Sequence, residues 1–394
     1  MTNAYINRIH HLAGKHIFSF ASSTKYLNPQ EIRMDNKWYQ DLAEAGKACE
    51  LLPRSTYLDL LTDSRVELIH LLDAAFTVRH HFHGRSVTVH IINNVSNGLC
   101  TEDCNYCPQS KSSKALISKY TEKNDDEILD EARQAYESGA FRYCMVYSGR
   151  GPNKAKTERI ASLVRTIKDR YPIEVCVSAG IMNENDTTVL KKSGLDRLNH
   201  NLNTSPLQYA KICSTHTFAD RLNTLKAARK SGLEICSGII AGMGETAEEL
   251  IELAIILRSL EAKSIPINFL LPITGNKLTT AQNLSPAYCL KILCLFRFII
   301  PPAEIRTAAG REYHLRSMEV MSLYPANSLF MEGYLNTRGK SRRDTLQMII
   351  DAGFTIQSDR SAEDLLQQEL AGSPDSRHPM PGLKSSEELH PARN

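Results

Sequence analysis

The chain has 394 residues, of which 42% are hydrophobic and 23% are charged, and its formal net charge is +3. This composition suits a soluble globular protein with one large α/β domain and extensions, or with two domains. The charge is too close to neutral to indicate binding to nucleic acid or to an anionic membrane, and no apolar run reaches the ~18 residues of a membrane span. The N-terminus lacks the apolar core and cleavage site of a signal peptide, so we expect a cytoplasmic protein.

The ten cysteines are many for a chain of this length. In an intracellular protein they favour metal or redox chemistry over disulfides. Cys289 and Cys294 lie in an apolar, helix-like run and are predicted to be inert core residues. Cys49 and Cys213 belong to no spacing pattern, and we interpret them as structural or incidental.

The first part of the chain is weakly patterned. We expect residues 1–64 to form an N-terminal extension that is partly helical, with one candidate helix from Asp35 to Leu52. Within residues 56–84, apolar residues recur at positions i, i+3, i+4 and i+7, which predicts a further helix.

From Ser86 onwards, strand-like and helix-like segments alternate. The candidate strands are 86–93, 141–147, 173–178, 196–202, 233–240, 264–270, 303–308 and 327–330. The candidate helices are 125–139, 156–170, 185–193, 217–231, 246–260, 285–298 and 313–323. Eight strands with intervening helices predict a parallel sheet, and their number fits an α/β fold of the (β/α)8 TIM-type barrel. A doubly wound open sheet is the alternative.

The barrel domain is expected to span residues 65–357, with a capping helix near 341–352. Residues 358–394 are rich in Ser, Pro, Glu and Arg and contain few aliphatic residues. This composition predicts a mostly disordered C-terminal tail.

Three cysteines, Cys100, Cys104 and Cys107, follow the first candidate strand at C-x3-C-x2-C spacing. Thiolates select zinc, copper(I) or iron–sulfur clusters. A structural zinc site needs a fourth ligand, and its cysteines usually come as paired C-x2-C motifs. A cubane cluster normally takes four cysteines, so three on one loop would leave one iron open to a small molecule. Structural zinc, or thiols with no shared role, remains the alternative.

Side chains along a strand alternate between its two faces. In six candidate strands, a Cys, Asn or Arg lies on the face opposite to aliphatic residues. These residues are Cys144, Cys176, Asn199, Asn201, Asn203, Cys236, Asn268 and Arg306. In a barrel, the aliphatic face packs on the helices and the other face lines the interior. We therefore expect a polar, thiol-rich lumen of the kind that binds a ligand.

The three lumen thiols allow two interpretations. They could be buried cysteines that act as small hydrophobes, which is common. Alternatively, they could hold a second iron–sulfur cluster together with one unusual ligand. Arg306 is an odd metal ligand because its pKa is above ~12, and hydrogen bonding to a bridging sulfide is the expectation from chemistry alone.

The cysteine loop, with Tyr106 before the third cysteine, resembles the cluster loop of the radical S-adenosylmethionine (SAM) enzymes, whose open iron binds SAM. Over roughly residues 65–335, the chain is similar to the biotin synthases. The stretches that carry this resemblance are NGLCTEDCNYCPQS, FRYCMVYSGRGP, LNHNLNTS, ICSGIIAGMGE, INFLLPITG and IRTAAGRE.

The resemblance implies a 4Fe-4S cluster on Cys100, Cys104 and Cys107. It also implies an auxiliary 2Fe-2S cluster, whose ligands would be Cys144, Cys176, Cys236 and Arg306. The family relation thus favours Arg306 as a true ligand.

The resemblance further assigns the binding residues. Asn199 and Asn268 would bind the ureido ring of dethiobiotin, because an amide offers both a donor and an acceptor. The residues expected at SAM are Tyr106, Asn201, Asn203, Arg221, Gly242, Gly244 and Glu245. Asn203 stands where many family members have Asp, which removes a charge but keeps an acceptor. Glu245 would also serve as an acid in the first turn of the following helix.

The implied activity is that of a sulfurtransferase of the radical SAM type, which converts dethiobiotin to biotin in the last step of biotin biosynthesis. The 4Fe-4S cluster donates an electron to SAM, the resulting 5′-deoxyadenosyl radical abstracts hydrogen from dethiobiotin, and the auxiliary cluster supplies sulfur. The family also implies a reductant protein such as flavodoxin or ferredoxin, and a homodimer. A related radical SAM enzyme with another small substrate and a non-catalytic iron–sulfur scaffold are the alternatives. A scaffold would not need Arg221, the asparagine strand or the glycine run.

Overall fold

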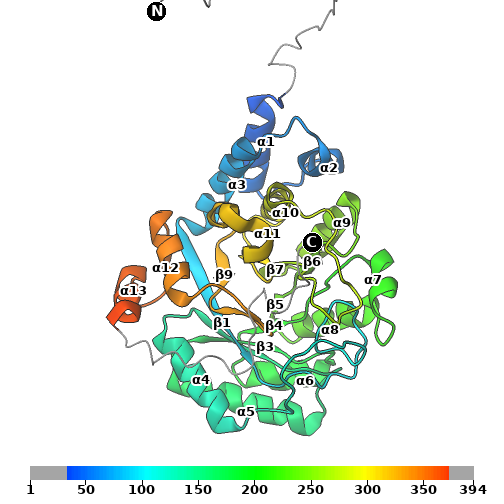
Figure 1. Ribbon diagram of the computed structural model, residues 1–394, viewed down its shortest axis with the longest axis vertical. Coiled ribbons are helices and arrows are strands. Elements are labelled where there is room, and N and C mark those ends of the chain that lie inside the picture. Colours follow the sequence, from blue (N-terminus) through cyan, green and yellow to red (C-terminus); the bar gives the residue numbers. More distant parts are fainter. Residues whose placement is uncertain (1–32, 372–394) are drawn as a thin grey trace, which may run out of the picture. The chain divides into compact units, whose positions relative to one another are not determined.

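The computed structural model describes residues 33–371, and parallel strands form a closed barrel within them. The strands are β1 (Ser86–Asn94), β2 (Arg142–Val146), β3 (Glu174–Ser178), β4 (Arg197–Asn199), β5 (Glu234–Cys236), β6 (Ile239–Ala241), β7 (Ser264–Phe269), β8 (Glu304–Thr307) and β9 (Ser328–Phe330). They follow one another around the ring, and β9 pairs with β1 to close it. This pairing confirms the (β/α)8 barrel and rules out the open sheet. Figure 1 shows the strands surrounded by helices.

One predicted strand, 233–240, is interrupted and forms both β5 and β6. The two pieces share one register with β7, since Cys236 pairs with Ser264 and Ile239 pairs with Ile267. The interruption lies beside Pro266, which has no backbone N–H to contribute to the ladder. A Cβ at Gly238 would lie 1.8 Å from the Pro266 carbonyl oxygen. Only glycine therefore fits at this point of the barrel wall.

Helices cover the outside of the barrel at nearly the predicted positions. They are α4 (Asp125–Glu137), α5 (Lys154–Arg170), α6 (Glu184–Lys192), α8 (Phe218–Lys230), α9 (Ala247–Ser259) and α10 (Pro286–Ile299). Asn124, Thr217 and Thr246 begin α4, α8 and α9 with reciprocal capping boxes, which satisfy backbone N–H groups that the helix leaves unpaired. The predicted helix 313–323 is a short α11 (Arg311–Leu315) followed by a 3-10 helix (Arg316–Leu323). The short α7 (Pro206–Ile212) was not predicted.

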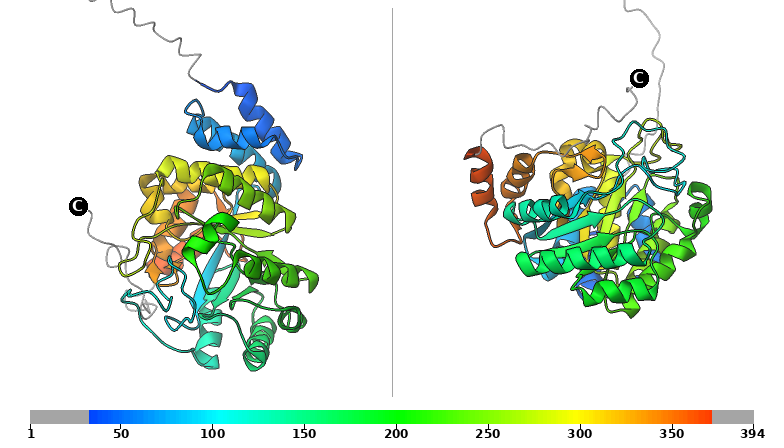
Figure 2. Two further views of the ribbon diagram at one scale, coloured as in Figure 1. Left: turned by 90° about the vertical axis from the view of Figure 1, so that its right-hand side faces the viewer. Right: turned by 90° about the horizontal axis from the view of Figure 1, so that it is seen from below.

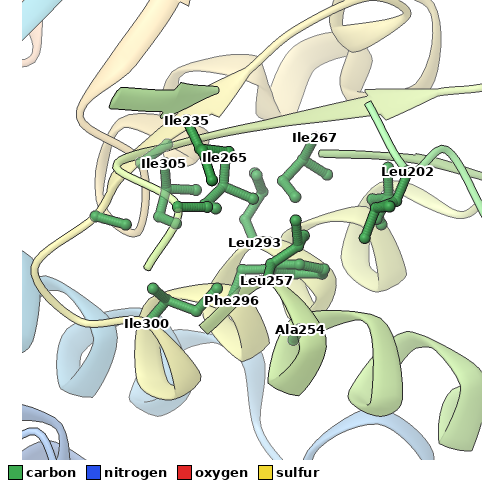
Figure 3. Packing of buried hydrophobic residues seen from close by; sticks show 14 of the residues in the cluster. Leu202, Ile235, Ala254, Leu257, Ile265, Ile267, Leu293, Phe296, Ile300 and Ile305 are labelled. Carbon is green, nitrogen blue, oxygen red and sulfur yellow. The ribbon is translucent and has the colours of Figure 1, made fainter. Parts of the chain in front are cut away.

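The main hydrophobic core lies between the barrel wall and the helices. Figure 3 shows Ile265, Ile267 and Ile305 of the strands pointing toward Leu257 of α9 and Phe296 of α10. All five side chains are fully buried. The aliphatic faces of the strands thus pack on the helices, as the alternation predicted. In α10, Cys289 and Cys294 are fully buried, which confirms that they are core residues.

The N-terminal helices are α1 (Asn36–Lys47), α2 (Arg54–Thr62) and α3 (Leu68–His83). They pack on α9 and α10, at the top of Figure 1, and the left view in Figure 2 shows the same arrangement. Helix α1 lies within the predicted helix Asp35–Leu52, and α3 within the helical pattern of residues 56–84. Residues 1–32 of the expected extension lie outside the described residues. Within residues 33–371, no helix is both long enough and apolar enough to cross a bilayer.

The C-terminal part corrects the prediction of a tail from residue 358. Helix α12 (Arg342–Asp351) lies at the position of the expected capping helix, and β12 (Thr355–Ile356) pairs with β1. Residues predicted to be disordered form α13 (Ala362–Ala371) beside α12. The helix forms because Leu365 and Ala362 are buried in an apolar cluster with Ile349. Residues 372–394 of the predicted tail lie outside the described residues.

Two leucines of α13 test this packing. Leu365 is 3% exposed and Leu370 is 55% exposed. Replacing Leu365 by Ala should lower the free energy of local opening of α13 by about 2 kcal/mol, because a buried apolar side chain is lost. Native-state hydrogen exchange of the α13 amides measures this change. Leu370→Ala is the matched control and should change protection by less than about 0.5 kcal/mol. Equal effects of the two variants would contradict the packing.

Candidate active site

The three loop cysteines follow the C-terminal end of β1, the end of the barrel at which active sites form in this architecture. Backbone hydrogen bonds fold the loop on itself, from Cys107 N–H to the Cys104 carbonyl (3.2 Å) and from Cys100 N–H to the Gln109 carbonyl (3.4 Å). Cys104 is buried, while Cys100 and Cys107 are partly buried. Burial raises the pKa of Cys107 to about 11. All three side chains line one cavity.

This cavity has a volume of about 260 Å³. Nine of the predicted site residues line it, and they come from the cysteine loop, β4 and the segment after it, α8 and β7. They are Cys100, Cys104, Tyr106, Cys107, Asn199, Asn201, Asn203, Arg221 and Asn268. The structure therefore brings together residues that are up to 168 positions apart in the sequence. Their individual roles stay predictions.

The asparagines line the cavity, but the backbone that carries Asn201 and Asn203 is not the predicted strand. Strand β4 ends at Asn199, earlier than the predicted strand 196–202, so strict alternation does not extend to Asn203. Asn203 instead adopts a left-handed backbone (φ 69°) and donates a hydrogen bond to the Tyr106 hydroxyl at 2.6 Å. The Asn201 Oδ1 accepts the N–H of Gly238 at 3.0 Å. Because the strand ends, His200 lines the cavity as well.

Asn268 is held by two backbone hydrogen bonds. Its Nδ2 donates to the Ile239 carbonyl at 2.9 Å, and its Oδ1 accepts the N–H of Ala309 at 3.2 Å. A carboxamide has two donor hydrogens and two acceptor lone pairs. Asn268 therefore keeps one donor and one acceptor for a ligand while its orientation is fixed.

Arg221 brings a cation to the cavity from the first turn of α8. Its Nε donates to the Tyr209 hydroxyl, one terminal nitrogen donates to the Asn201 carbonyl at 2.8 Å, and the other donates to His216 Nε2 at 3.0 Å. The Tyr209 hydroxyl and the Asn201 carbonyl orient the guanidinium without neutralising it. A ligand carboxylate could therefore pair with it.

Gly242, Gly244 and Glu245 lie in the turn after β6 and are not among the cavity-lining residues. Both glycines have positive φ (97° and 101°), and the Glu245 carboxylate accepts the N–H groups of Gly242 (2.6 Å) and Met243 (2.9 Å). Glu245 thus fixes the turn. Its predicted role as an acid of the first helical turn is wrong, because Thr246 is the N-cap of α9 and Glu245 precedes it.

The lumen thiols form a second set next to the cavity. Cys144 and Cys176 are directly paired on β2 and β3, and Cys236 shares their buried cluster. A terminal nitrogen of Arg306 lies 3.9 Å from the Cys236 Sγ, and the Nδ2 of Asn199 lies 3.2 Å from the same sulfur. Asn199 lines the cavity, so it connects the cavity to the second set of thiols.

Below the thiols, a buried charge network centres on Glu304, which sequence reasoning missed. Its carboxylate accepts hydrogen bonds from Arg142 (3.1 Å), Arg197 (3.0 Å) and Arg306, and it lies 3.1 Å from His90 Nε2. Burial alone would raise the pKa of Glu304, but the charges of Arg306 and Arg142 hold this pKa well below its usual range. Burial and the neighbouring Arg306 lower the pKa of His90 to about 3, so His90 is neutral. The position of Arg142 could have been predicted from the sequence, since it lies two residues before Cys144 and therefore on the same face of the strand.

A short hairpin that was also not predicted closes part of the cavity. It consists of β10 (Gly333–Tyr334) and β11 (Thr337–Arg338), and all of its residues from Tyr334 to Thr337 line the cavity. The Nδ2 of Asn97, just before the cysteine loop, donates to the Asn336 Oδ1 at 2.7 Å. The turn contains Leu335 at a φ of 50°, a conformation for which leucine gives no signal in a sequence.

Cys213 lies next to the cysteine loop, although nothing in the sequence connects the two. Its Sγ lies 3.8 Å from the Cys104 Sγ and 3.3 Å from an oxygen of Asp103. The hydrogen bond with Cys104 is the main cause that lowers the pKa of Cys213 to about 6. Cys213 was predicted to be either structural or incidental, and these buried contacts favour a structural residue. Its position 109 residues after Cys104 offers no spacing that could have revealed the contact.

Comparison with known proteins identifies relatives along most of the chain. The model of the radical SAM superfamily matches residues 94–255, and that of the biotin and thiamin synthesis associated domain matches residues 266–355. A biotin synthase from Magnetococcus marinus is 56% identical over 316 residues, which cover 80% of this chain and 98% of that protein. A biotin synthase from Acaryochloris marina is 52% identical over 312 residues, covering 79% and 90%.

Solved structures share the fold at much lower identity. The FeFe-hydrogenase maturase HydG from Carboxydothermus hydrogenoformans has a TM-score of 0.69 at 19% identity, covering 83% of this chain and 81% of that one. Methylornithine synthase has the same TM-score and identity, covering 82% and 98%. At this identity, the likeness supports the barrel alone.

The network around Glu304 can be tested by changing its charge. In Glu304→Gln, three buried arginines lose their shared carboxylate, so the free energy of unfolding should fall by about 3–5 kcal/mol. Urea-induced unfolding measures it. The control is Glu184→Gln, because Glu184 makes an exposed ion pair with Lys230 (2.7 Å), and its effect should stay below about 1 kcal/mol. A loss of less than that in Glu304→Gln would show that the network does not depend on this charge.

Proposed function

The chain belongs to the biotin synthase family of radical SAM enzymes, and from this premise we propose which of its residues carry out the family's reaction. It is a sulfur-inserting enzyme that uses SAM, a 4Fe-4S cluster and a 2Fe-2S cluster and converts dethiobiotin to biotin. One observation supports the residue assignment most strongly. A single cavity is lined by the three loop cysteines and, through Asn199, contacts the second set of thiols.

We assign the 4Fe-4S cluster to Cys100, Cys104 and Cys107. The 2Fe-2S cluster is assigned to three further thiols and one arginine, Cys144, Cys176, Cys236 and Arg306. The donor chemistry fits, because soft thiolates are the ligands of iron–sulfur clusters and a metal ion replaces the proton of a buried thiol. When bound, the first cluster supplies an electron for the cleavage of SAM, and the second supplies the sulfur that enters the substrate.

The SAM site lies on the side of the cysteine loop. Arg221 pairs with the SAM carboxylate, and its bonds to the Asn201 carbonyl and Tyr209 hold it in place. Asn203, oriented by the Tyr106 hydroxyl, binds the ribose, together with Asn201. Gly242, Gly244 and Glu245 act indirectly, since their turn holds Met243 in an apolar cluster with Cys104.

Asn199 and Asn268 bind the ureido ring of dethiobiotin. The free donor and acceptor of Asn268 match the ring's carbonyl and N–H groups. Because Asn199 lies 3.2 Å from the Cys236 Sγ, a ring bound to it places the neighbouring substrate carbons beside the second thiol set. The hairpin residues Tyr334 and Leu335 exclude water from this part of the cavity.

The buried charges below the thiols have a positioning role. Glu304 orients Arg306 through their ion pair, and the Ser264 hydroxyl accepts a further hydrogen bond from Arg306 at 2.9 Å. The guanidinium is thereby aimed at the thiols. A scaffold that only carries a cluster would need neither this arrangement nor Arg221 on the cavity wall.

The physiological context rests on the family relation. We propose a flavodoxin or ferredoxin as the electron donor, a homodimer as the assembly and the cytoplasm as the location. The buried position of the second thiol set supports delivery of electrons through the more accessible cysteine loop.

Two alanine variants separate the two clusters. Cys104→Ala should lose the 4Fe-4S cluster and abolish both 5′-deoxyadenosine and biotin, because SAM can no longer be cleaved. Cys144→Ala should keep the 4Fe-4S cluster and SAM cleavage but lose the 2Fe-2S cluster and biotin. Mössbauer spectroscopy and mass spectrometry measure these outcomes, with Cys49→Ala as the control. If Cys144→Ala still formed biotin, the assignment of the lumen thiols would be wrong.

The substrate role of Asn199 predicts a selective kinetic effect. Asn199→Ala should raise the KM for dethiobiotin by about tenfold, which corresponds to about 1.4 kcal/mol for one lost hydrogen bond. The KM for SAM should change by less than about twofold. The matched control is Asn185→Ala on the exposed surface of α6. A tenfold increase in the KM for SAM with an unchanged KM for dethiobiotin would place Asn199 at SAM instead, and equal increases would show that the effect is not selective.

A further inference from the structure

The guanidinium of Arg221 lies against His216, a buried histidine that is not among the cluster, SAM and substrate residues assigned above. We propose that His216 is a positioning residue which, together with Glu102, orients Arg221 toward the carboxylate of SAM. This inference rests on the proposed pairing of Arg221 with that carboxylate. It adds the two residues that prepare Arg221 for the pairing.

The hydrogen bonds of Arg221 leave it ready to bind a carboxylate. A guanidinium has five N–H groups. The Nε donates to the Tyr209 hydroxyl, one terminal nitrogen donates to the Asn201 carbonyl at 2.8 Å, and the other donates to His216 Nε2 at 3.0 Å. Each terminal nitrogen therefore keeps one N–H. Two such N–H groups are the donors of a bidentate pair with a carboxylate, and Arg221 presents them on the wall of the cavity.

His216 and Asn201 hold the two terminal nitrogens of Arg221, one each, so together they fix the plane of the guanidinium. The imidazole of His216 is itself almost inaccessible to solvent. If the His216 acceptor were lost, an N–H of Arg221 would lack a partner, and the side chain would turn to find another one. The remaining N–H groups would then no longer face the cavity as a pair.

His216 can accept this hydrogen bond only as one tautomer of the neutral imidazole. Arginine can only donate, so the Nε2 that Arg221 contacts carries a lone pair. The opposite nitrogen, Nδ1, donates its hydrogen to the Glu102 carboxylate at 2.6 Å. The same oxygen of Glu102 accepts a hydrogen bond from Arg150 at 3.3 Å. Glu102 therefore selects the tautomer that leaves Nε2 free to accept from Arg221.

This chain of hydrogen bonds begins on the cysteine loop. Glu102 lies between the first two loop cysteines, and its side chain is buried. The next residue, Asp103, accepts the backbone N–H of Ser214 at 2.9 Å, so the segment that carries His216 is fixed against the same loop. The orientation of Arg221 is thereby set relative to the loop to which we assign the 4Fe-4S cluster.

The test measures how the anaerobic holoenzyme binds two ligands, SAM and decarboxylated SAM, which lacks the carboxylate. Isothermal titration calorimetry gives both Kd values independently of turnover. His216→Asn keeps an amide N–H for Glu102 but has no atom within reach of Arg221. The longer side chain of His216→Gln can present an amide oxygen to Arg221.

His216→Asn should weaken the binding of SAM by about fivefold, the effect of one hydrogen bond, and should leave the Kd of decarboxylated SAM within about twofold of the parent. His216→Gln should stay within about twofold for both ligands, as should His81→Asn, the control on the exposed surface of α3. Equal losses for the two ligands in His216→Asn would show a merely structural role and would overturn the inference. An unchanged Kd for SAM in His216→Asn, or an equal loss in His216→Gln, would overturn it as well.

Two further measurements complete the test. If the His216 variants fail to fold, ¹⁵N NMR of the histidines in the parent chain still tests the tautomer, and a proton on Nε2 of His216 would overturn the inference. Arg221→Ala separates the inference from the proposed function, since it should reduce the preference for SAM over decarboxylated SAM. If it keeps the full preference of the parent, the proposed pairing of Arg221 with the carboxylate is wrong, and the inference with it. If Arg221→Ala loses the preference while His216→Asn keeps it, the inference alone is wrong.

Discussion

The arrangement of the barrel interior depends on one buried carboxylate, that of Glu304. Three arginines from different strands converge on it, and their charges would be very costly in an apolar interior without a shared partner. With this carboxylate as their shared partner, the arginines can remain charged in the interior. Arg306 is held by its ion pair and by Ser264, and its remaining nitrogen points at the thiol of Cys236. The charge network thus holds Arg306 in position beside the second set of thiols.

The cavity lies between the two proposed cluster sites, one for the cleavage of SAM and one for the transfer of sulfur. The cysteine loop lies at the mouth of the barrel and the lumen thiols lie within it, and Asn199 touches both the cavity and the Cys236 sulfur. A substrate held by Asn199 and Asn268 would therefore lie between a SAM site and a sulfur source. The backbone hydrogen bonds of Asn268 fix its amide before any ligand arrives, which lowers the cost of ordering it on binding.

Features that arise from local sequence pattern could be predicted. The alternation in Phe141–Val146 and Ile173–Val177 placed Cys144 and Cys176 on the lumen face, and the structure pairs them directly. Contacts that depend on distant parts of the chain could not be predicted in this way. The carboxylate of Glu304 shows no pattern in the sequence, because its partners come from β1, β2, β4 and β7. Cys213 lies beside Cys104 where Asp103 binds the backbone of Ser214 and Thr215, the residues that follow Cys213. The composition of residues 362–371 led to a wrong prediction of disorder, since α13 is docked by the buried side chains of Ala362 and Leu365 and by an ion pair between Arg342 and Glu369.

The central claim is that two separate thiol sets hold two clusters, one set lining the cavity and the other connected to it through Asn199. The most direct measurement is the anomalous scattering of iron in crystals grown anaerobically with dethiobiotin and SAM. We expect two iron sites, one at Cys100, Cys104 and Cys107 and the other at Cys144, Cys176 and Cys236 beside Arg306, with dethiobiotin between them in contact with Asn199. Iron at the cysteine loop alone, or a second iron site away from the lumen thiols, would contradict the account.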